Sequence, residues 1–187
     1  MFMRSERLFL RPGWPEDWQE LFARIRDEDI VRNMVSAPWP YTIEDAREFS
    51  SRVQQTGLPH FFVTLPGKKG SDLIGCVGLS DLGAGIELGY WIARDYWGNG
   101  YATEASQAVL RLARALGHRR ILASYFHDNP ASGRVLEKAG FKPTGQNLRR
   151  FSLARGEQVA SVECAIDLQT AEREHLSDDD PEARMAA

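Results

Sequence analysis

The fold is decided by one short stretch, Tyr96-Trp97-Gly98-Asn99-Gly100-Tyr101-Ala102-Thr103, which joins a predicted strand to a predicted helix. Glycines at such a junction let the backbone approach a ligand closely and turn successive amide groups the same way. The start of the helix adds its own unpaired N–H groups and a partial positive charge. The stretch is therefore a candidate phosphate site, although a Gly-x-Gly turn can equally be a plain connection between two elements.

Two common phosphate-binding motifs do not fit this stretch. No Gly-Lys-Ser/Thr follows it, as a P-loop would require to hold a nucleoside triphosphate and magnesium. Thr103 stands where the dinucleotide fingerprint has a third glycine, and no acidic residue ends a strand about 20 residues further on. The stretch belongs to neither class.

Outward from this stretch, the chain alternates between predicted strands and predicted helices. The strands are expected at 7–11, 61–65, 73–79, 86–92, 121–126, 141–144 with 150–153, and 159–168. Helical spacing of apolar residues marks four helices: one through 18–25, one that opens at Thr42 and reaches Val53, one over 103–116, and one from Pro130 to about 139. The alternation predicts an α/β protein with a mixed sheet.

The charge distribution separates a domain from a tail. The chain has 187 residues, 43% of them hydrophobic, and a formal net charge of −3, which suits one domain of ordinary composition. Residues 169–187 alone carry a net charge of −4 and no aromatic residue, so residues 1–168 are close to neutral. We expect a domain over 1–168 and an acidic, disordered tail over 169–187, which is either merely solvated or a partner-binding or autoinhibitory segment.

Several classes of protein are disfavoured by composition. No apolar run reaches the roughly 18 residues of a membrane span, and the first residues lack the layout of a secretory signal. The two cysteines, Cys76 and Cys164, are too few for a disulfide framework and too far apart for a metal knuckle. Basic residues are scattered rather than gathered in a stripe. We therefore expect a cytoplasmic protein with no metal, no membrane contact and no nucleic-acid partner.

Two longer blocks of sequence carry a family resemblance. The first is Glu87-Leu88-Gly89-Tyr90-Trp91-Ile92, followed by the glycine-rich stretch and Glu104-Ala105; the second runs from Asn129-Pro130-Ala131-Ser132 to Gly140-Phe141. Together they resemble the GNAT N-acetyltransferases, and the opening Glu6-Arg7-Leu8 is similar to their RimJ/RimL-like branch. The resemblance spans about residues 5–168. It implies a GNAT fold: a central mixed, mostly antiparallel sheet, splayed between two parallel strands and flanked by about four helices.

The same resemblance implies acetyl-CoA as co-substrate and assigns its contacts. The amides of the turn residues would hold the pyrophosphate: Gly98, Asn99, Gly100, Tyr101, Ala102 and Thr103. Trp91, Ile92 and Ala93 would offer backbone groups to the pantetheine, as an added strand does in peptide recognition. Trp97 stands where many members have Gln or Arg, and it either contacts the coenzyme or packs under the turn. Asn129 would cap its helix, contact the pantetheine, or both.

Two residues are candidates for the chemistry. Some family members place a carboxylate base at the strand position of Glu87, so Glu87 would take the amine proton; otherwise it is a structural carboxylate. Ser132 matches the position from which the branch is thought to protonate the coenzyme thiolate; otherwise its hydroxyl satisfies the first turn of a helix.

The expected activity is therefore acetyl transfer from acetyl-CoA to a primary amine, by direct attack in a ternary complex. The acceptor is either a protein N-terminus or a small-molecule amine, with its contacts expected from residues 12–60, and a homodimer is compatible with the sequence. A catalytically silent acyl-CoA-binding sensor or scaffold is the alternative from another class.

Overall fold

The computed structural model describes residues 1–53, 55–67 and 70–168, so the predicted acidic tail lies outside the described residues. The strands are β1 (Met3–Arg4), β2 (Phe9–Arg11), β3 (His60–Gly67), β4 (Gly70–Asp81), β5 (Ile86–Ile92), β6 (Arg120–Phe126), β7 (Lys142–Ser152) and β8 (Glu157–Asp167). The α-helices in these ranges are α1 (Trp18–Ile25), α2 (Glu28–Val31), α3 (Ile43–Ser50), α4 (Tyr101–Ala115) and α5 (Pro130–Ala139).

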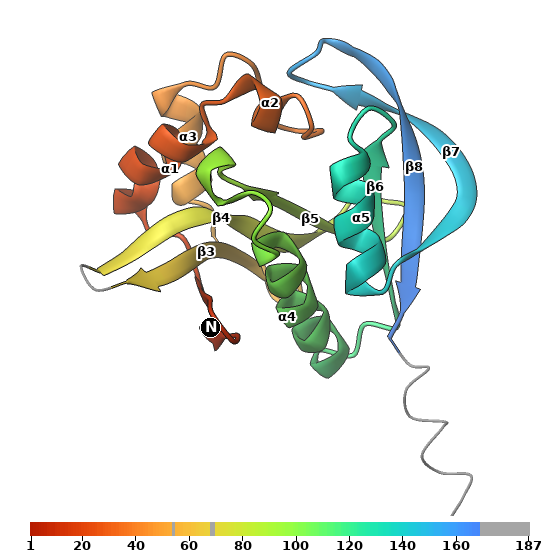
Figure 1. Ribbon diagram of the computed structural model, residues 1–187, viewed down its shortest axis with the longest axis horizontal. Helices are drawn as coiled ribbons and strands as arrows, with labels where there is room; N and C mark the ends of the chain where they lie inside the picture. Colours follow the sequence, from red (N-terminus) through yellow and green to blue (C-terminus); the bar gives the residue numbers. More distant parts are fainter. Residues whose placement is uncertain (54, 68–69, 169–187) are drawn as a thin grey trace, which may run out of the picture.

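The strands form one mixed sheet in the order β1-β2-β3-β4-β5-β6-β8-β7 (Figure 1). Every neighbouring pair is antiparallel except β5 and β6, which are parallel. That parallel pair is in register at one point only, Glu87 opposite Leu122. Beyond this point the two strands diverge, which confirms the predicted fold class and its splayed pair. We call the place where they part the fork.

Helices cover both faces of the sheet. On one face, α4 and α5 pack side by side over a core that includes Phe61, Ile74 and Val109. On the other face, α1, α2 and α3 cover a second core that includes Phe62 and Leu73. Because side chains of a strand point alternately to opposite faces, neighbours such as Phe61 and Phe62 enter different cores. Side chains at the end of β5 alternate in the same way, and this alternation determines which of them face the cavity described below.

The predicted elements agree with the structure at most positions. β5 has the predicted bounds, and Thr42 caps α3 through a reciprocal pair of hydrogen bonds with Asp45. The continuation of α3 to Val53 is wrong: the helix ends at Ser50, whose hydroxyl donates to the carbonyl oxygen of Ala46, a local bond that competes with helix continuation. Val53 is consequently 90% exposed instead of packed.

Three other features differ from the predicted pattern. The two pieces expected at 141–144 and 150–153 form one strand, β7, which pairs with β8 on both sides of an irregularity between Pro143 and Asn147. That irregularity interrupts the apolar alternation and hides the continuity of the strand. The two-residue β1 and the single-turn α2 are too short to leave a periodic signal.

Candidate active site

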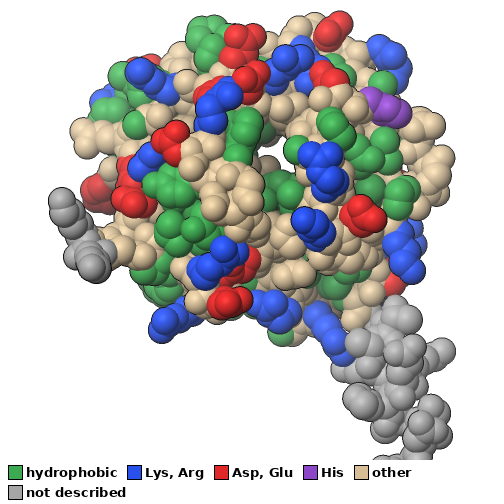
Figure 2. All heavy atoms as spheres, viewed as in Figure 1, with side chains coloured by type: hydrophobic (Ala, Val, Ile, Leu, Met, Phe, Trp, Pro, Cys, Tyr) green, Lys and Arg blue, Asp and Glu red, His purple; other side chains and the backbone are tan. Residues whose placement is uncertain are grey.

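A cavity of about 670 Å³ opens where β5 and β6 separate. Five segments line it: α2 with the residues after it, the end of β5, the turn before α4, the loop after β6, and α5. Figure 2 shows the corresponding hollow near the centre of the molecule, between the positions that α2, α4 and α5 occupy in Figure 1. The fork therefore creates the cavity, and loops and helix ends form its walls.

The glycine turn, residues 98–103, forms one wall of the cavity. Gly98 and Gly100 have φ values of 77° and 79°, in the left-handed region that favours glycine, and Gly100 directly precedes α4. Gly98, Gly100 and the first three residues of α4 all line the cavity. The unpaired amides at the start of α4 therefore belong to the cavity wall, which is the arrangement that suits a phosphate group.

Asn99 is the member of the turn that does not line the cavity. Its side-chain nitrogen donates to the carbonyl oxygens of Tyr96 (3.2 Å) and Trp97 (3.0 Å). Asn99 thus fixes the shape of the turn from behind instead of facing a ligand with its side chain.

A second support for the glycine turn comes from the N-terminal segment. Glu104 accepts hydrogen bonds from the Ser5 hydroxyl (2.6 Å) and from the backbone amide and Nε of Arg7 (2.7 and 2.8 Å). Arg7 also donates from Nη1 to the carbonyl oxygen of Asn99 (3.0 Å). These bonds join two parts of the family resemblance that lie 97 residues apart, and no local pattern in the sequence signals the contact.

Trp97 closes the end of β5. Its indole nitrogen donates to the carbonyl oxygen of Ile92 at 2.6 Å, while 46% of the residue remains exposed. The hydrogen bond agrees with the packing interpretation, and the exposed ring still lines the cavity. The Ile92 carbonyl is therefore engaged within the protein.

Backbone directions at the end of β5 decide which groups face the fork. The amide of Ala93 donates to the carbonyl oxygen of Ile74 on the β4 side at 2.8 Å. Alternate residues of an antiparallel strand address the same neighbour, so the backbone of Trp91 also faces β4, and the Ile92 amide faces the fork. Of the three predicted pantetheine contacts, the structure thus directs the backbone of Ile92 alone toward β6. Ala93 does not line the cavity.

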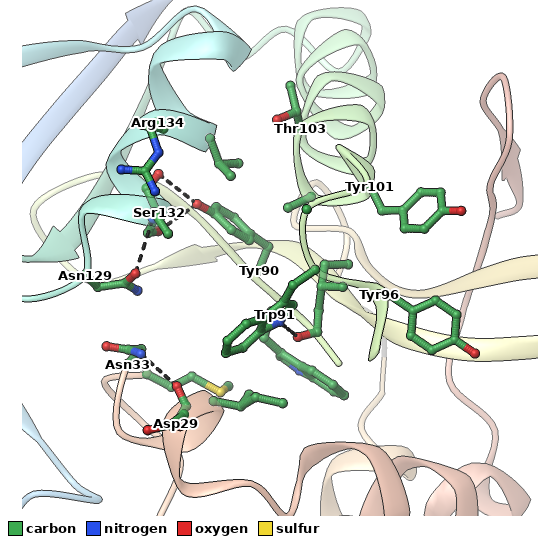
Figure 3. A pocket seen from close by; sticks show the side chains of 18 of the residues that line it. Asp29, Asn33, Tyr90, Trp91, Tyr96, Tyr101, Thr103, Asn129, Ser132 and Arg134 are labelled. Atoms are coloured by element: carbon green, nitrogen blue, oxygen red, sulfur yellow. Dashed lines mark hydrogen bonds between the residues drawn. The ribbon is translucent and has the colours of Figure 1, made fainter. Parts of the chain in front are cut away.

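Ser132 lies on the opposite wall, in the first turn of α5. Its backbone amide donates to the side-chain oxygen of Asn129 (3.3 Å), so Asn129 is the helix cap. The hydroxyl of Ser132 has another partner, the phenol of Tyr90, at 2.7 Å (Figure 3). The helix-capping interpretation of Ser132 therefore does not describe its hydroxyl, which lies in the cavity wall.

Tyr90 is a site residue that the sequence analysis missed. It precedes Trp91 on β5, so its side chain points to the α4/α5 face while Trp91 packs into the other core. Burial raises the pKa of Tyr90 to about 12, which keeps its phenol protonated at neutral pH. The alternation of β5 would have placed Tyr90 on the cavity side, but nothing in the sequence indicates its contact with Ser132.

Glu87 lies at the fork and not among the residues that line the cavity. Both of its carboxylate oxygens accept from the guanidinium of Arg150 on β7, each at 2.7 Å. The hydroxyl of Ser124 on β6 donates to the same carboxylate at 2.9 Å. The residue is 9% exposed. This engagement is what the structural interpretation of Glu87 predicts, because three donors already occupy the carboxylate.

A further wall of the cavity consists of residues 29–34 and is called the α2 wall. Arg155, on the turn between β7 and β8, fastens it: Nε donates to the Arg32 carbonyl at 2.8 Å, and the two Nη atoms bind the Asp128 carboxylate at 2.7 and 3.1 Å. The hydrogen bond from Arg155 lowers the pKa of Asp128. The range 12–60 expected for acceptor contacts contains the α2 wall, but the part played by the β7–β8 turn was not predicted.

Two basic side chains of α5, Arg134 and Lys138, also line the cavity. They are four residues apart and so share one side of the helix. Neither forms an ion pair with any other described residue. Figure 2 shows basic side chains over α5 beside the hollow. These are cations of the right kind for the phosphates of a coenzyme, and the sequence analysis had quoted both without a role.

The described residues contain neither a metal-binding cluster nor a membrane-spanning helix. Within residues 1–53, 55–67 and 70–168, no group of three or more His, Cys, Asp or Glu side chains is placed to hold a metal ion. In the same part of the chain, no helix has the length and apolar character needed to cross a membrane.

The fold and the cavity define an acyltransferase of the type that binds a coenzyme at a splayed pair of strands. The family described as acetyltransferase (GNAT) domain matches residues 7–142, which is well over half of the chain. The chain belongs to this family, and it is an N-acetyltransferase. The β7–β8 turn, which fastens the α2 wall, lies beyond the matched residues.

Comparisons with individual proteins agree. An uncharacterised N-acetyltransferase of Bacillus subtilis, YoaA, is 29% identical over 168 residues, covering 82% of this chain and 89% of the relative. A GNAT-family acetyltransferase structure from Bacillus anthracis is 28% identical, has a TM-score of 0.75, and aligns over 90% of this chain and 99% of its own.

A more distant structure shows the same fold. RimL, a ribosomal L7/L12 alpha-N-protein acetyltransferase solved with coenzyme A, is 17% identical, has a TM-score of 0.73, and aligns over 89% of this chain and 98% of its own. A protein of this fold thus binds coenzyme A.

Proposed function

We propose that this chain transfers the acetyl group of acetyl-CoA to a primary amine by direct attack in a ternary complex. The observation that carries the proposal is the position of Ser132, which lines the same cavity as the glycine turn at the fork. A coenzyme whose pyrophosphate rests on the turn can extend its pantetheine along β5 toward that hydroxyl. The cavity also has a second wall, the α2 wall, for an acceptor.

The coenzyme would be held by backbone and by cations. The amides at the start of α4 suit the pyrophosphate, and Arg134 and Lys138 supply positive charge from the facing helix. The amide of Ile92 faces the fork, where an extended pantetheine could pair with it as an added strand. Asn129 remains beside this path as the cap of α5.

The reaction would proceed without a covalent enzyme intermediate. The amine nitrogen forms a bond to the acetyl carbon, the carbon–sulfur bond breaks, and one proton passes in net from the amine to the sulfur. Ser132 would donate its hydroxyl hydrogen toward the sulfur as negative charge develops there, and then recover a proton. The cavity holds the two reactants in contact, which supplies the remaining acceleration through orientation.

For Glu87 we propose a structural role in place of the role of base: its carboxylate ties β5 to Ser124 of β6 and Arg150 of β7. A base for the amine must reach the proton that it removes, whereas Glu87 is bound to Arg150 and Ser124 beneath the cavity. The amine would then lose its proton to solvent before attack. The pH dependence of kcat/KM should accordingly follow the ionisation of the acceptor itself.

The acceptor class is a primary amine on a protein N-terminus or on a small molecule. The carboxylates beside the α2 wall are paired with arginines, Asp29 with Arg94 and Asp128 with Arg155. They therefore do not select the acceptor by charge. The activity named for RimL makes a protein N-terminus the first acceptor to test.

The test is a search for acetylated products. Purified protein and isotopically labelled acetyl-CoA are added to a cell extract, to peptides with free N-termini and to a panel of small amines, and labelled products are identified by mass spectrometry. We expect label on a primary amine, with the signal much reduced for Ser132→Ala. Binding of acetyl-CoA without thioester consumption on any acceptor would instead support the silent coenzyme-binding alternative.

A further inference from the structure

The first turn of α5 is held by two tyrosines, one from each strand of the fork. Tyr125 of β6 lies against Gly133, where an added Cβ would come within 2.8 Å of the tyrosine ring. Tyr90 of β5 contacts the preceding residue, Ser132. The first turn of α5 therefore contacts both diverging strands, β6 through Gly133 and β5 through Ser132, which fixes its place relative to the cavity.

The contact between Tyr90 and Ser132 is a double one. The phenol oxygen lies 3.1 Å from the backbone carbonyl oxygen of Ser132, to which it donates, and 2.7 Å from the serine hydroxyl oxygen. Figure 3 shows Tyr90 pointing across the cavity wall at Ser132, with both interactions converging on its hydroxyl. Either hydroxyl can be the donor across the 2.7 Å contact. When the phenol donates to the serine oxygen, the hydrogen of the serine is left for another acceptor.

We propose that Tyr90 is a positioning residue for Ser132: its phenol donates to the serine hydroxyl oxygen and so leaves the serine O–H directed into the cavity, toward the sulfur of the coenzyme. This inference rests on the proposed function, in which Ser132 donates to that sulfur. A donor to the hydroxyl oxygen also polarises the O–H bond and makes it a better donor in turn.

Tyr90 is suited to this role because it holds its proton. Its phenol is buried against the α4/α5 core, and that burial keeps it neutral across the pH range in which an amine can attack. A serine with a rotating hydroxyl would spend part of its time donating to a backbone carbonyl. A phenol that donates to the serine oxygen holds the hydroxyl in place and so disfavours that alternative.

The first test is a set of single substitutions. Tyr90→Phe keeps the ring and removes the hydroxyl, so we expect kcat to fall about 3- to 10-fold, the effect of one hydrogen bond, with the KM for acetyl-CoA nearly unchanged. Ser132→Ala should lower kcat by about 10²-fold or more. Tyr41→Phe is the matched control, because Tyr41 is buried in the other core and does not line the cavity; its kcat should stay within twofold of wild type.

A double substitution separates positioning from packing. If Tyr90 acts through Ser132, then Tyr90→Phe in the Ser132→Ala background should lower kcat no further. Independent, multiplied losses would overturn the proposal, as would a Tyr90→Phe protein that loses coenzyme affinity at unchanged kcat. An unchanged or raised kcat in Tyr90→Phe would also overturn it, because the serine would then be donating to the phenol.

A second measurement needs no acceptor. The thiol of bound CoA is titrated by the ultraviolet absorbance of its thiolate; a hydroxyl that donates to sulfur stabilises the thiolate and lowers the pKa of the thiol. We expect that pKa to rise in both Ser132→Ala and Tyr90→Phe and to stay at the wild-type value in Tyr41→Phe. A chain that binds CoA but acetylates no amine would refute the proposed function, while this titration would still decide the role of Tyr90.

Discussion

The glycine turn and the α2 wall, two of the walls of the cavity, are built by different means. The glycine turn obtains its shape from backbone conformation, with two left-handed glycines followed directly by the start of α4. The α2 wall obtains its shape from side chains that reach it from far away in the sequence. Arg155 contacts Arg32 across 123 residues, and Arg94 binds Asp29 across 65 residues. The glycine turn is thus shaped mainly by its own backbone, with support from Arg7, whereas the α2 wall is assembled from distant residues.

This difference means that a substitution can alter one wall and leave the other unchanged. A substitution in the β7–β8 turn changes the α2 wall without touching the amides at the start of α4. The converse also holds, because a Cβ at Gly98 or Gly100 would meet no residue of the α2 wall within 4 Å. The fork lies between these two walls, and Glu87 is the residue of β5 at the point where the strands part. Substitutions at these three places should therefore have separable effects.

The largest effect is expected at the glycine turn. Valine at position 100 would need a φ near 79°, which β-branched residues avoid, so the turn must change its backbone conformation. Acetyl-CoA at 100 times its Kd should stabilise the wild type by about 2.7 kcal/mol, and Gly100→Val should lose most of that gain. Thermal unfolding with and without acetyl-CoA measures it.

Gly117→Val is the matched control for this substitution. Gly117 has a φ of 87° and open space around its Cβ position, at the far end of α4. It should suffer the same backbone strain and yet keep its stabilisation by acetyl-CoA. Equal stabilisation of Gly100→Val and Gly117→Val would remove the turn from the coenzyme site.

The next effect is expected at the fork. Glu87→Gln leaves the guanidinium of Arg150 without its carboxylate in a nearly buried place, so we expect a loss of about 1–3 kcal/mol of unfolding free energy by denaturant titration. Arg120→Gln, which breaks an exposed pair with Asp167, should change stability by no more than about 0.5 kcal/mol.

Glu87→Gln also tests whether Glu87 is a structural carboxylate or the base that takes the amine proton. The rising limb of kcat/KM should persist in Glu87→Gln and move with the amine pKa when two acceptors are compared. A limb that disappears in Glu87→Gln, with the fold intact, would restore Glu87 as the base and overturn our assignment.

A smaller and more selective effect is expected at the α2 wall. Arg155→Gln removes the bonds that tie Arg32 and Asp128 to the β7–β8 turn, so the wall should lose its fixed position. We expect the KM for the amine to rise about 3- to 10-fold, while the Kd for acetyl-CoA, measured by titration calorimetry, stays unchanged. Parallel losses of both affinities would mean that the two walls are not separable.

The smallest expected effect is on thermal stability at low pH. The Arg155 hydrogen bond holds the pKa of Asp128 below its usual range, so the pair stabilises the fold above the ordinary carboxyl pKa of about 3.9 and loses that contribution as pH falls through the lower, folded value. Because Asp128 is half exposed, the pair should contribute about 0.5 kcal/mol or less. The Tm difference between wild type and Arg155→Gln should begin to shrink as pH falls below about 3.9 and should vanish only below the lowered, folded pKa of Asp128. A difference that does not change on acidification would show that packing of Arg155 dominates.

The contrast between the walls also sets how much could be predicted from sequence. The glycine turn, β5 and the cap at Asn129 are local features, and their residue types indicate their conformation directly. The face of Tyr90 follows from strand alternation. The contact between Tyr90 and Ser132 depends on how α5 packs against the fork, and tertiary packing leaves no local signal in the sequence.

Glu87 shows the limit of reasoning from position in a strand. Its place on β5 was predicted correctly, but its partner Arg150 lies 63 residues away on a strand that the sequence analysis divided in two. Without β7 as a continuous strand, nothing could bring that guanidinium to the fork. The α2 wall was hidden for the same reason, since Arg155 follows directly from the same strand pair.

The order of strands in the sheet has a consequence for how the protein forms during synthesis. β7 has no described strand partner except β8, and β8 inserts between β7 and β6. On the ribosome, where the chain emerges from its N-terminus, the glycine turn, α4 and α5 can assemble while β7 still has nothing to pair with. Once β8 emerges, it pairs with β6 and β7 and delivers Arg150 to the fork and Arg155 to the α2 wall. A nascent chain should therefore gain a place for its coenzyme before it gains a place for an amine.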